Sequence, residues 1–333
     1  MGYLVSVVIP VYNKENKIRE TFQSIVNQTY KNYEIVIIDD GSKDRGIEII
    51  RELLSLNNSI KYKIIIQKNS GVSIARNKGI ENSSGEYIFF IDGDDIIKPE
   101  CLETLVNNMI HNKSDMSVCG FKVMENNKVV NQLYTKGICI HDMKDYLKMF
   151  IMGKTYIYMG NALYKRKIII DNNIEFDNKY KYNEDQIFAY KYIISCRNIV
   201  QDNGIYFIYF RGKDSATMKA VDERYSNINI FLDFIKYLGN DKFSEINDTI
   251  TKLIYNYKIP VSILNACYDL IGLNYSIKQF INVLNTDKYL FNMLGNYSKQ
   301  YSIKRYYKIN LLRTNPYLMF YIIRLEKFIK KFK

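Results

Sequence analysis

The first hundred residues alternate between short apolar runs and segments of helical periodicity, which restricts the chain to few folds. Four runs are rich in β-branched residues, at Val5–Val11, Tyr33–Ile38, Tyr62–Gln67 and Tyr87–Ile91. Between them, apolar residues recur every three to four positions, as in Ile18–Gln28 and Gly46–Leu56. Strands that alternate with such helices form βαβ units, and continuously apolar strands are typical of a sheet covered on both faces. The sequence therefore predicts an α/β fold with a mostly parallel sheet.

The pattern changes after Pro99, and the chain is long enough for about two domains at roughly 150 residues each. The next segments predicted are helices at Glu100–Asn112 and Glu184–Ser195 and strands at Met116–Phe121 and Ile205–Arg211. From about Val221 onward the periodicity is helical. We expect an α/β domain at residues 1–215 and an α-helical region at residues 216–333.

The net charge is concentrated near the C-terminal end. The chain has 47 basic and 35 acidic residues, a net charge of +12, and residues 304–333 hold nine of the basic residues and one acid. The remainder is close to neutral, which argues against a nucleic-acid partner. No apolar run approaches the 18 or so residues of a membrane span, and no signal-peptide pattern opens the chain, so we expect a cytosolic protein. The five cysteines are widely spaced without a CxxC pair, which argues against a zinc site and a disulfide framework.

Acidic residues follow two of the apolar runs. Asp39 and Asp40 come directly after Tyr33–Ile38, and Asp92-Gly93-Asp94-Asp95 comes after Tyr87–Ile91. Ligands of open α/β sheets bind outside the carboxyl ends of the strands, where both clusters should lie. Two carboxylates around a glycine suit a divalent cation that shares its ligands with phosphates. A polar turn has the same composition, so the neighbouring segments must decide.

Four segments occur in a fixed order: SVVIPVYNKE (6–15), SIVNQTYKNYEIVIIDDGSKD (24–44), NSGVSIARNKG (69–79) and SGEYIFFIDGDD (84–95). With them the chain strongly resembles the family 2 glycosyltransferases of the GT-A fold, densely over residues 5–100 and again over 160–215. The resemblance implies a Rossmann-like, nucleotide-binding half at 1–100 and an acceptor-side half at 101–215. It also implies that the DxD motif holds Mn²⁺ or Mg²⁺ on the diphosphate of a sugar nucleotide.

The resemblance assigns a role to each matching residue of the nucleotide-binding half. Those that would frame the nucleoside are Pro10, Tyr12 and Glu15, with Asp39 accepting from the uracil imide, Asp40 beside it, and Gly71 and Arg76 closing over base and ribose. Asp92 would contact the ribose and Asp94 the metal, with Asp92 as a second candidate ligand; the role of Asp95 is open. Arg76 could instead belong to the exposed start of a helix.

On the acceptor side, Glu184 and Asp185 match the acidic pair of the family. The resemblance implies that Asp185 is the base and that Glu184 supports it. An acidic pair can also simply stabilise a helix N-terminus. Arg211 matches a basic residue near the diphosphate, although a cation capping a strand end is an equal alternative. Ala162 stands where the family often has a lysine, which leaves the acceptor contacts open.

The segment Tyr317–Phe332 predicts a helix with one apolar stripe and a basic remainder. The stripe comprises Leu318, Ile322, Leu325, Ile329 and Phe332, and the basic residues are Arg324, Lys327, Lys330 and Lys331. Such a helix can lie on an anionic membrane, although a packed terminal helix has the same pattern. We expect residues 304–333 to bind the inner face of the cell membrane peripherally. The helical region would then contact the membrane or a second copy in a homodimer.

The resemblance implies a metal-dependent inverting glycosyltransferase. It would move a hexose or N-acetylhexosamine from a UDP-sugar to a saccharide hydroxyl, free or lipid-linked, in surface-polysaccharide synthesis. The alternatives are a sugar nucleotidyltransferase and a non-catalytic sugar-nucleotide- or polysaccharide-binding protein. The first strand lacks a following Gly-rich basic loop, which argues against the former, and the intact Glu184–Asp185 pair argues against the latter.

Overall fold

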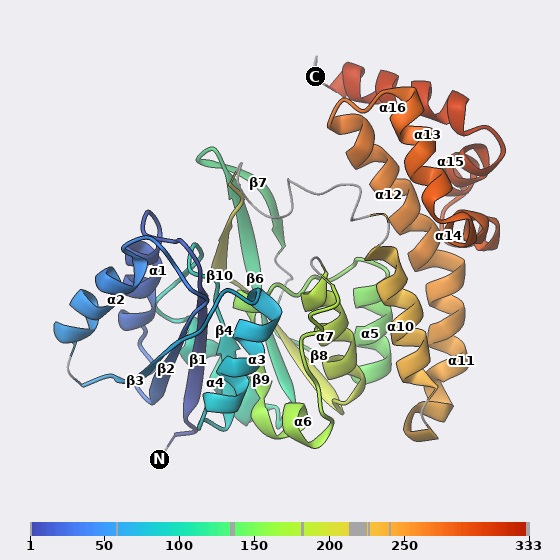
Figure 1. Ribbon diagram of the computed structural model, residues 1–333. Coiled ribbons are helices and arrows are strands. Elements are labelled where there is room, and N and C mark those ends of the chain that lie inside the picture. Colours follow the sequence, from blue (N-terminus) through green and yellow to red (C-terminus); the bar gives the residue numbers. More distant parts are fainter. Residues whose placement is uncertain are drawn as a thin grey trace. The chain divides into compact units, whose positions relative to one another are not determined.

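Two compact units make up the chain in the computed structural model (Figure 1). The first comprises residues 1–150 and 155–212, and the second comprises residues 151–154 and 213–333. The structure describes residues 2–57, 59–133, 137–180, 183–212, 225, 227–239 and 241–330.

The first unit begins with the predicted alternation of strands and helices. The strands are β1 (Val5–Val11), β2 (Tyr33–Asp39), β3 (Lys61–Ile66) and β4 (Tyr87–Phe90), parallel and in the order β3-β2-β1-β4. The helices between them are α1 (Ile18–Val26), α2 (Gly46–Ser55) and α3 (Val72–Asn82). β1, β2 and β4 are buried throughout, as their apolar sequences predict. β3 is largely exposed despite its apolar sequence, because it forms the edge of the sheet.

The same sheet continues through the second half of this unit in the order β4-β9-β6-β10-β5. Its strands are β5 (Ile96–Ile97), β6 (Met116–Glu125), β7 (Lys128–Leu133), β8 (Cys139–Asp142), β9 (Ala162–Lys165) and β10 (Asn198–Phe210). β9 runs antiparallel to both β4 and β6, while β6 and β10 are parallel. The sequence pattern did not reveal β7, β8 or β9. These strands are short, and pairing with distant neighbours defines them more than an apolar run does.

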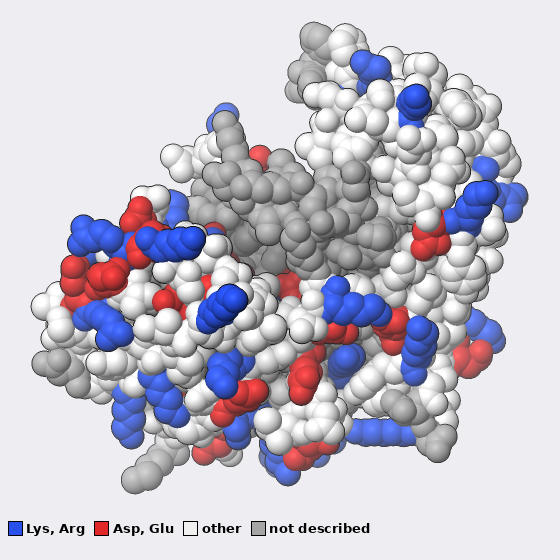
Figure 2. All heavy atoms as spheres, viewed as in Figure 1, with Lys and Arg blue, Asp and Glu red and all other residues white. Residues whose placement is uncertain are grey.

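Helices and a short turn complete the first unit. They are α4 (Cys101–His111), α5 (Met143–Ile151), a 3₁₀ turn at Met159–Asn161, α6 (Arg166–Asp171) and α7 (Glu184–Ile194). α3 lies directly against β1, where a Cβ atom on Gly79 would come 2.2 Å from Cγ1 of Val8. Only glycine permits this approach, and it brings the polar side of α3 close to the carboxyl ends of the central strands. Basic and acidic side chains are interspersed over the face of this unit that Figure 2 shows.

The second unit is helical. Its helices are α10 (Ile230–Leu238), α11 (Ser244–Leu253), a π-helical turn at Ile254–Lys258, α12 (Ile259–Gly272), α13 (Ile277–Thr286), α14 (Lys288–Asn292), α15 (Ile303–Thr314) and α16 (Pro316–Lys330). Short 3₁₀ turns lie at Asn227–Asn229, Asp241–Phe243 and Met293–Asn296. α12 is central and packs against α13, α14, α15 and α16. None of the helices in the described ranges combines the length and apolar character needed to cross a bilayer.

Candidate active site

Asp39 ends β2 and lies beside β1 at the carboxyl edge of the sheet, where it pairs in register with Val11. Its side chain is buried, and its Oδ1 accepts the backbone N–H of Ser42 at 2.9 Å. Its Oδ2 has no hydrogen bond from the residues that the structure describes. An ionised carboxylate can only accept hydrogen bonds, so this oxygen suits a ligand N–H group.

Asp40 has a different task from its neighbour, because its carboxylate anchors the loop that leads into α3. It accepts hydrogen bonds from the side chain of Gln67 at 2.8 Å and from the backbone N–H groups of Ser70 and Gly71 at 2.7 and 2.9 Å. Gly71 has a φ of 92°, a conformation that glycine adopts without strain. Asp40 therefore holds this loop in place at the start of α3.

Arg76, on α3, joins the two acidic segments that the sequence singled out. Its Nη2 lies 2.9 and 3.1 Å from the carboxylate oxygens of Asp92, and its Nη1 lies 2.9 Å from Oε1 of Glu184. The guanidinium centre lies 5.2 Å from the ring centre of Phe176. Because the side chain is only 5% exposed, the alternative of Arg76 at the exposed start of a helix is wrong.

The charges around Arg76 keep it ionised. Burial alone would lower its pKa, but the carboxylates of Asp92 and Glu184 raise it above its ordinary value. A planar guanidinium can bind two carboxylates at once, which an ammonium group does less well. The two acidic segments lie 92 residues apart in sequence, and Arg76 fixes them side by side.

Glu184 and Asp185 form the first turn of α7, after Asn183 with a φ of 64°. Burial raises the pKa of Glu184 to about 7, together with the charge of Asp185 and against the opposing charge of Arg76. Burial also raises the pKa of Asp185, opposed by the charge of Arg76 and the hydrogen bond from the N–H of Gln186. A carboxylate with a raised pKa is suited to accept a proton near neutral pH.

The DxD loop presents three carboxylates in three environments. Asp92 is bound to Arg76, while Oδ2 of Asp94 is bound to the ammonium group of Lys14. Asp95 is buried and accepts the N–H of Phe210 at 3.1 Å. Burial, followed by the charges of Asp92 and Asp94, raises the pKa of Asp95 well above its ordinary value. Of the three acids of this loop, Asp92 and Asp94 have partly exposed side chains, whereas Asp95 is buried.

A divalent ion fits this loop on the chemistry of its donors. Asp94 offers carboxylate oxygens, keeps 32% of its side chain exposed and already binds a cation in the form of Lys14. Within the described ranges, no group of three or more His, Cys, Asp or Glu side chains is placed to hold a metal. Mg²⁺ and ions of similar chemistry are commonly held by one or two carboxylates together with substrate phosphates. Asp94, with Asp92 beside it, fits that arrangement.

The first-strand residues lie around the end of β1. Pro10 is buried within the strand, and the ring of Tyr12 is 45% exposed. The carboxylate of Glu15 accepts the backbone N–H of Arg45 at 3.1 Å.

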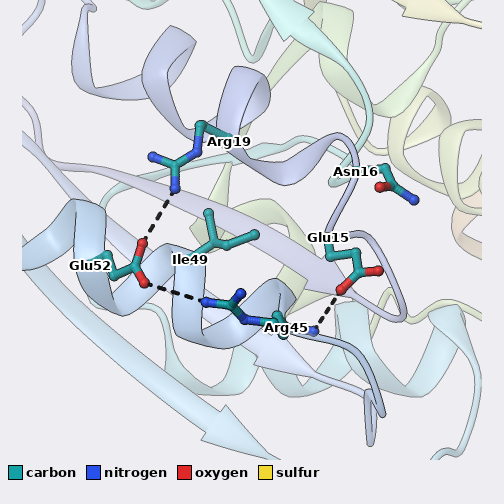
Figure 3. A pocket seen from close by; sticks show the side chains of 6 residues that line it. All are labelled: Glu15, Asn16, Arg19, Arg45, Ile49 and Glu52. Atoms are coloured by element: carbon teal, nitrogen blue, oxygen red, sulfur yellow. Dashed lines mark hydrogen bonds and ion pairs between the residues drawn. The ribbon is translucent and has the colours of Figure 1, made fainter.

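Figure 3 shows Glu15 at one side of a hollow of about 240 Å³ between α1 and α2. Glu52 lies across this hollow, 3.3 Å from Arg19 and 3.9 Å from Arg45. In the structure Glu15 thus stabilises the β2–α2 loop.

Arg211 follows β10 and donates its backbone N–H to the carbonyl of Met124 at 2.8 Å. Its guanidinium lies 3.8 Å from the carboxylate of Glu125. Ala162 is fully buried in β9, so this position belongs to the core of the sheet.

Two residues near the site were missed by the sequence reasoning. Lys14 stands within the first quoted segment but received no role, although its place just beyond a central strand could have drawn attention to it. Tyr158 carries no motif at all. Burial raises the pKa of its hydroxyl group, and the charges of Arg211, Asp185 and Asp95 act on it as well. Only the fold could bring it to this place.

A Rossmann-like sheet with acids at its carboxyl edge and a second acidic pair opening a helix defines a class, the glycosyltransferases of the GT-A fold. The model of the family "Glycosyl transferase family 2" matches residues 6–172, half of the chain. The chain belongs to this family.

Relatives agree with this assignment, and a solved structure has the same fold. The putative glycosyltransferase EpsH of Bacillus subtilis is 32% identical over 59% of this chain and 57% of its own length. The poly(ribitol-phosphate) β-N-acetylglucosaminyltransferase TarP of Staphylococcus aureus is 29% identical over 77% of this chain and 73% of its own. The crystal structure of S. aureus TarS in complex with UDP-GlcNAc matches with a TM-score of 0.72 at 20% identity, over 99% of this chain and 92% of that one. The chain thus spans little more than half of EpsH and about three quarters of TarP.

Proposed function

We propose that this glycosyltransferase moves a hexose or N-acetylhexosamine from a UDP-sugar to a hydroxyl group of a saccharide acceptor, with inversion and with the help of a divalent ion. The observation that carries the proposal is the double ion pair of Arg76 with Asp92 and Glu184. It joins the loop that would hold the donor to the helix that would supply the base. A protein that only bound sugar nucleotides would not need the second of these contacts.

On the donor side, we assign the uracil to Asp39, whose Oδ2 is available to an imide N–H, and to the exposed ring of Tyr12. The nucleoside site would be supported by residues that do not contact the base directly. These are Pro10 at the end of β1, and Asp40, Gly71 and Glu15, which belong to or stabilise the two neighbouring loops. Asp92 would approach the ribose. These assignments match residues 1–100 to the nucleotide-binding half.

Asp94 would hold Mn²⁺ or Mg²⁺ together with the oxygens of the diphosphate. A bound ion would supply positive charge to the departing diphosphate. Arg211, at the end of β10, would add a further positive charge on that side. EDTA should therefore lower both UDP affinity and turnover.

On the acceptor side, Asp185 would remove the proton of the attacking hydroxyl group, and Glu184 would support it through Arg76. Burial raises the pKa of Asp185, which suits this task. Residues 101–215 would form the acceptor half, and the relatives named above favour a role in surface-polysaccharide synthesis.

The C-terminal helix supports a peripheral contact with anionic membrane. α16 buries Met319, Phe320 and Ile323, and it exposes the opposite face. That face carries Tyr317, Leu318, Tyr321, Leu325 and Phe328, each between 48% and 59% exposed. Figure 2 has the same view as Figure 1, and at the position of α16 its surface is mostly uncharged, with separate basic side chains.

The net positive charge of residues 304–333 complements an anionic surface, and each basic residue near it contributes about 1 kcal/mol. A membrane contact of this kind would bring the enzyme to a lipid-linked acceptor on the inner face of the cell membrane. A homodimer is the competing occupant of the same face, and the vesicle measurement described below separates the two.

The test of the proposed function is UDP release from UDP-glucose, UDP-galactose, UDP-GlcNAc and UDP-GalNAc, with Mn²⁺ or EDTA. We expect release from one of them with Mn²⁺, and loss of release in Asp185→Asn. Asp145→Asn, at a solvent-facing position of α5, is the matched control and should retain release. If none of the four donors bound to the wild-type chain, the proposal would be wrong.

A further inference from the structure

Lys14 lies over the DxD loop without a role in the function proposed so far. Its carbonyl oxygen accepts the N–H groups of Lys17 and Ile18 at 2.9 Å each, which fixes its backbone at the start of α1. Its stem covers Gly93, where an added Cβ would lie 3.3 Å from Cγ of Lys14. Its ammonium group is bound to the carboxylate of Asp94.

The ammonium group of Lys14 lies against Asp94, where a metal cation bound to the DxD loop would also lie. The other two acids have different partners, since Asp92 binds Arg76 and Asp95 binds the backbone of Phe210. The ammonium group of a lysine carries a positive charge at neutral pH, as a bound metal cation does. About a third of each side chain, Lys14 and Asp94, is exposed. The ion pair can therefore open without disturbing the core.

We propose that the ammonium group of Lys14 has two alternative partners at the diphosphate site. It pairs with the carboxylate of Asp94 when no donor is bound, and it pairs with the donor's diphosphate when the donor binds. The ligand class is a nucleoside diphosphate, so the inference rests on the proposed function. An ammonium group and a divalent ion compete for the same carboxylate. The diphosphate removes that competition because its oxygens accept from the displaced lysine.

This arrangement has two consequences. Mn²⁺ alone should bind weakly, because it must displace Lys14 from Asp94. UDP should keep part of its affinity when all metal is removed, because Lys14 still contributes a positive charge. The affinity for uridine, which has no phosphate, should not depend on Lys14.

The experiment measures Mn²⁺ binding without nucleotide by electron paramagnetic resonance, and UDP and uridine binding by calorimetry in EDTA and in Mn²⁺. The variants are Lys14→Met, Lys14→Arg and, as a matched loss of charge on an exposed surface, Lys78→Met. We expect Lys14→Met to bind Mn²⁺ alone several-fold more tightly than wild type. In EDTA it should bind UDP about tenfold more weakly, the effect of one charge-assisted hydrogen bond. Uridine affinity should be unchanged, Lys14→Arg should recover most of the UDP affinity, and Lys78→Met should match wild type throughout.

Equal Mn²⁺ affinity in Lys14→Met and wild type would overturn the competition at Asp94. Equal UDP affinity in EDTA, or a parallel loss for uridine, would overturn the role at the diphosphate. If wild type bound no UDP even with Mn²⁺, the proposed function and the diphosphate role would both be wrong. The titration with Mn²⁺ alone would then still decide whether Lys14 and the ion compete.

Discussion

The two acidic segments of the first unit are alike in sequence and unlike in environment. Asp92 and Asp94 follow strand β4, keep about a third of their side chains exposed, and are each bound to a cation. Glu184 and Asp185 open a helix, and burial raises the pKa of both. Partly exposed carboxylates that already pair with cations suit a ligand that carries a cation. Buried carboxylates with a raised pKa suit proton transfer.

Arg76 is the point at which the two segments meet. It forms an ion pair with one carboxylate of each, so both segments depend on the same guanidinium group. In the proposed function, the acids that hold the ligand are the partly exposed ones, and the acids that accept a proton are buried ones at the start of a helix. Three measurements can break or sharpen this division, and a fourth tests the helical unit, which takes no part in it.

The largest effect is expected from removing one acid of each segment. Asp185→Asn should lower turnover by about 10²–10⁴-fold, the usual contribution of a positioned base, while UDP affinity stays the same. Asp94→Asn should lower UDP affinity in Mn²⁺ and remove the difference between Mn²⁺ and EDTA. The measurements are UDP release and calorimetry, with Asp145→Asn as control. If both variants lost UDP affinity equally, the division into two tasks would fail.

Arg76→Met tests the link between the segments. Removing a buried partner leaves uncompensated carboxylates, so the free energy of unfolding should fall by about 3 kcal/mol. The control is Arg19→Met, because Arg19 is half exposed and its pair with Glu52 should contribute no more than about 1 kcal/mol. Urea denaturation followed by circular dichroism measures both. An equal loss of unfolding free energy in the two variants would show that the ion pairs of Arg76 stabilise the fold no more than an exposed pair does.

The pH dependence tests the raised pKa of the acidic pair. Asp185 can act as a base only when ionised, so turnover should fall as the pH falls through its raised pKa. This acid limb should lie at higher pH than the pKa of about 4 of an exposed aspartate. Glu184→Gln removes a neighbouring negative charge and should shift the limb to lower pH. Glu175→Gln, at an exposed position, should not shift it, and an unshifted limb in Glu184→Gln would contradict the coupling of the pair.

The smallest effect concerns the helical unit. Full-length protein should bind anionic vesicles less as salt increases, and Leu325→Glu with Tyr321→Glu should weaken binding about tenfold without changing UDP affinity. Ser298→Glu, which adds one negative charge outside α16, is the control in vesicle sedimentation. Equal vesicle binding by the double variant would show that this face does not contact the membrane. A concentration-dependent dimer that the double variant disrupts would assign the face to a second copy.

Much of the fold of residues 1–100 could be predicted from the sequence because its signals are local. The β-branched residues of Val5–Val11 are enough to predict a buried strand there, and the acids after Tyr33–Ile38 and Tyr87–Ile91 follow at fixed positions. The apolar sequence of β3 predicted a buried strand, and this was wrong, because β3 lies at the edge of the sheet and is largely exposed. β9 was missed because pairing with β4 and β6 defines it.

By itself, then, the sequence determined the α/β pattern, the family and the acids at the strand ends, since each depends on residues near one another in the chain. The tertiary structure alone decided that Arg76 joins Asp92 to Glu184, that Lys14 binds Asp94, and that α16 exposes the face bearing Leu325. Ion pairs across long sequence separations and the burial that shifts a pKa depend on which segments pack together. No local pattern of residues specifies that packing.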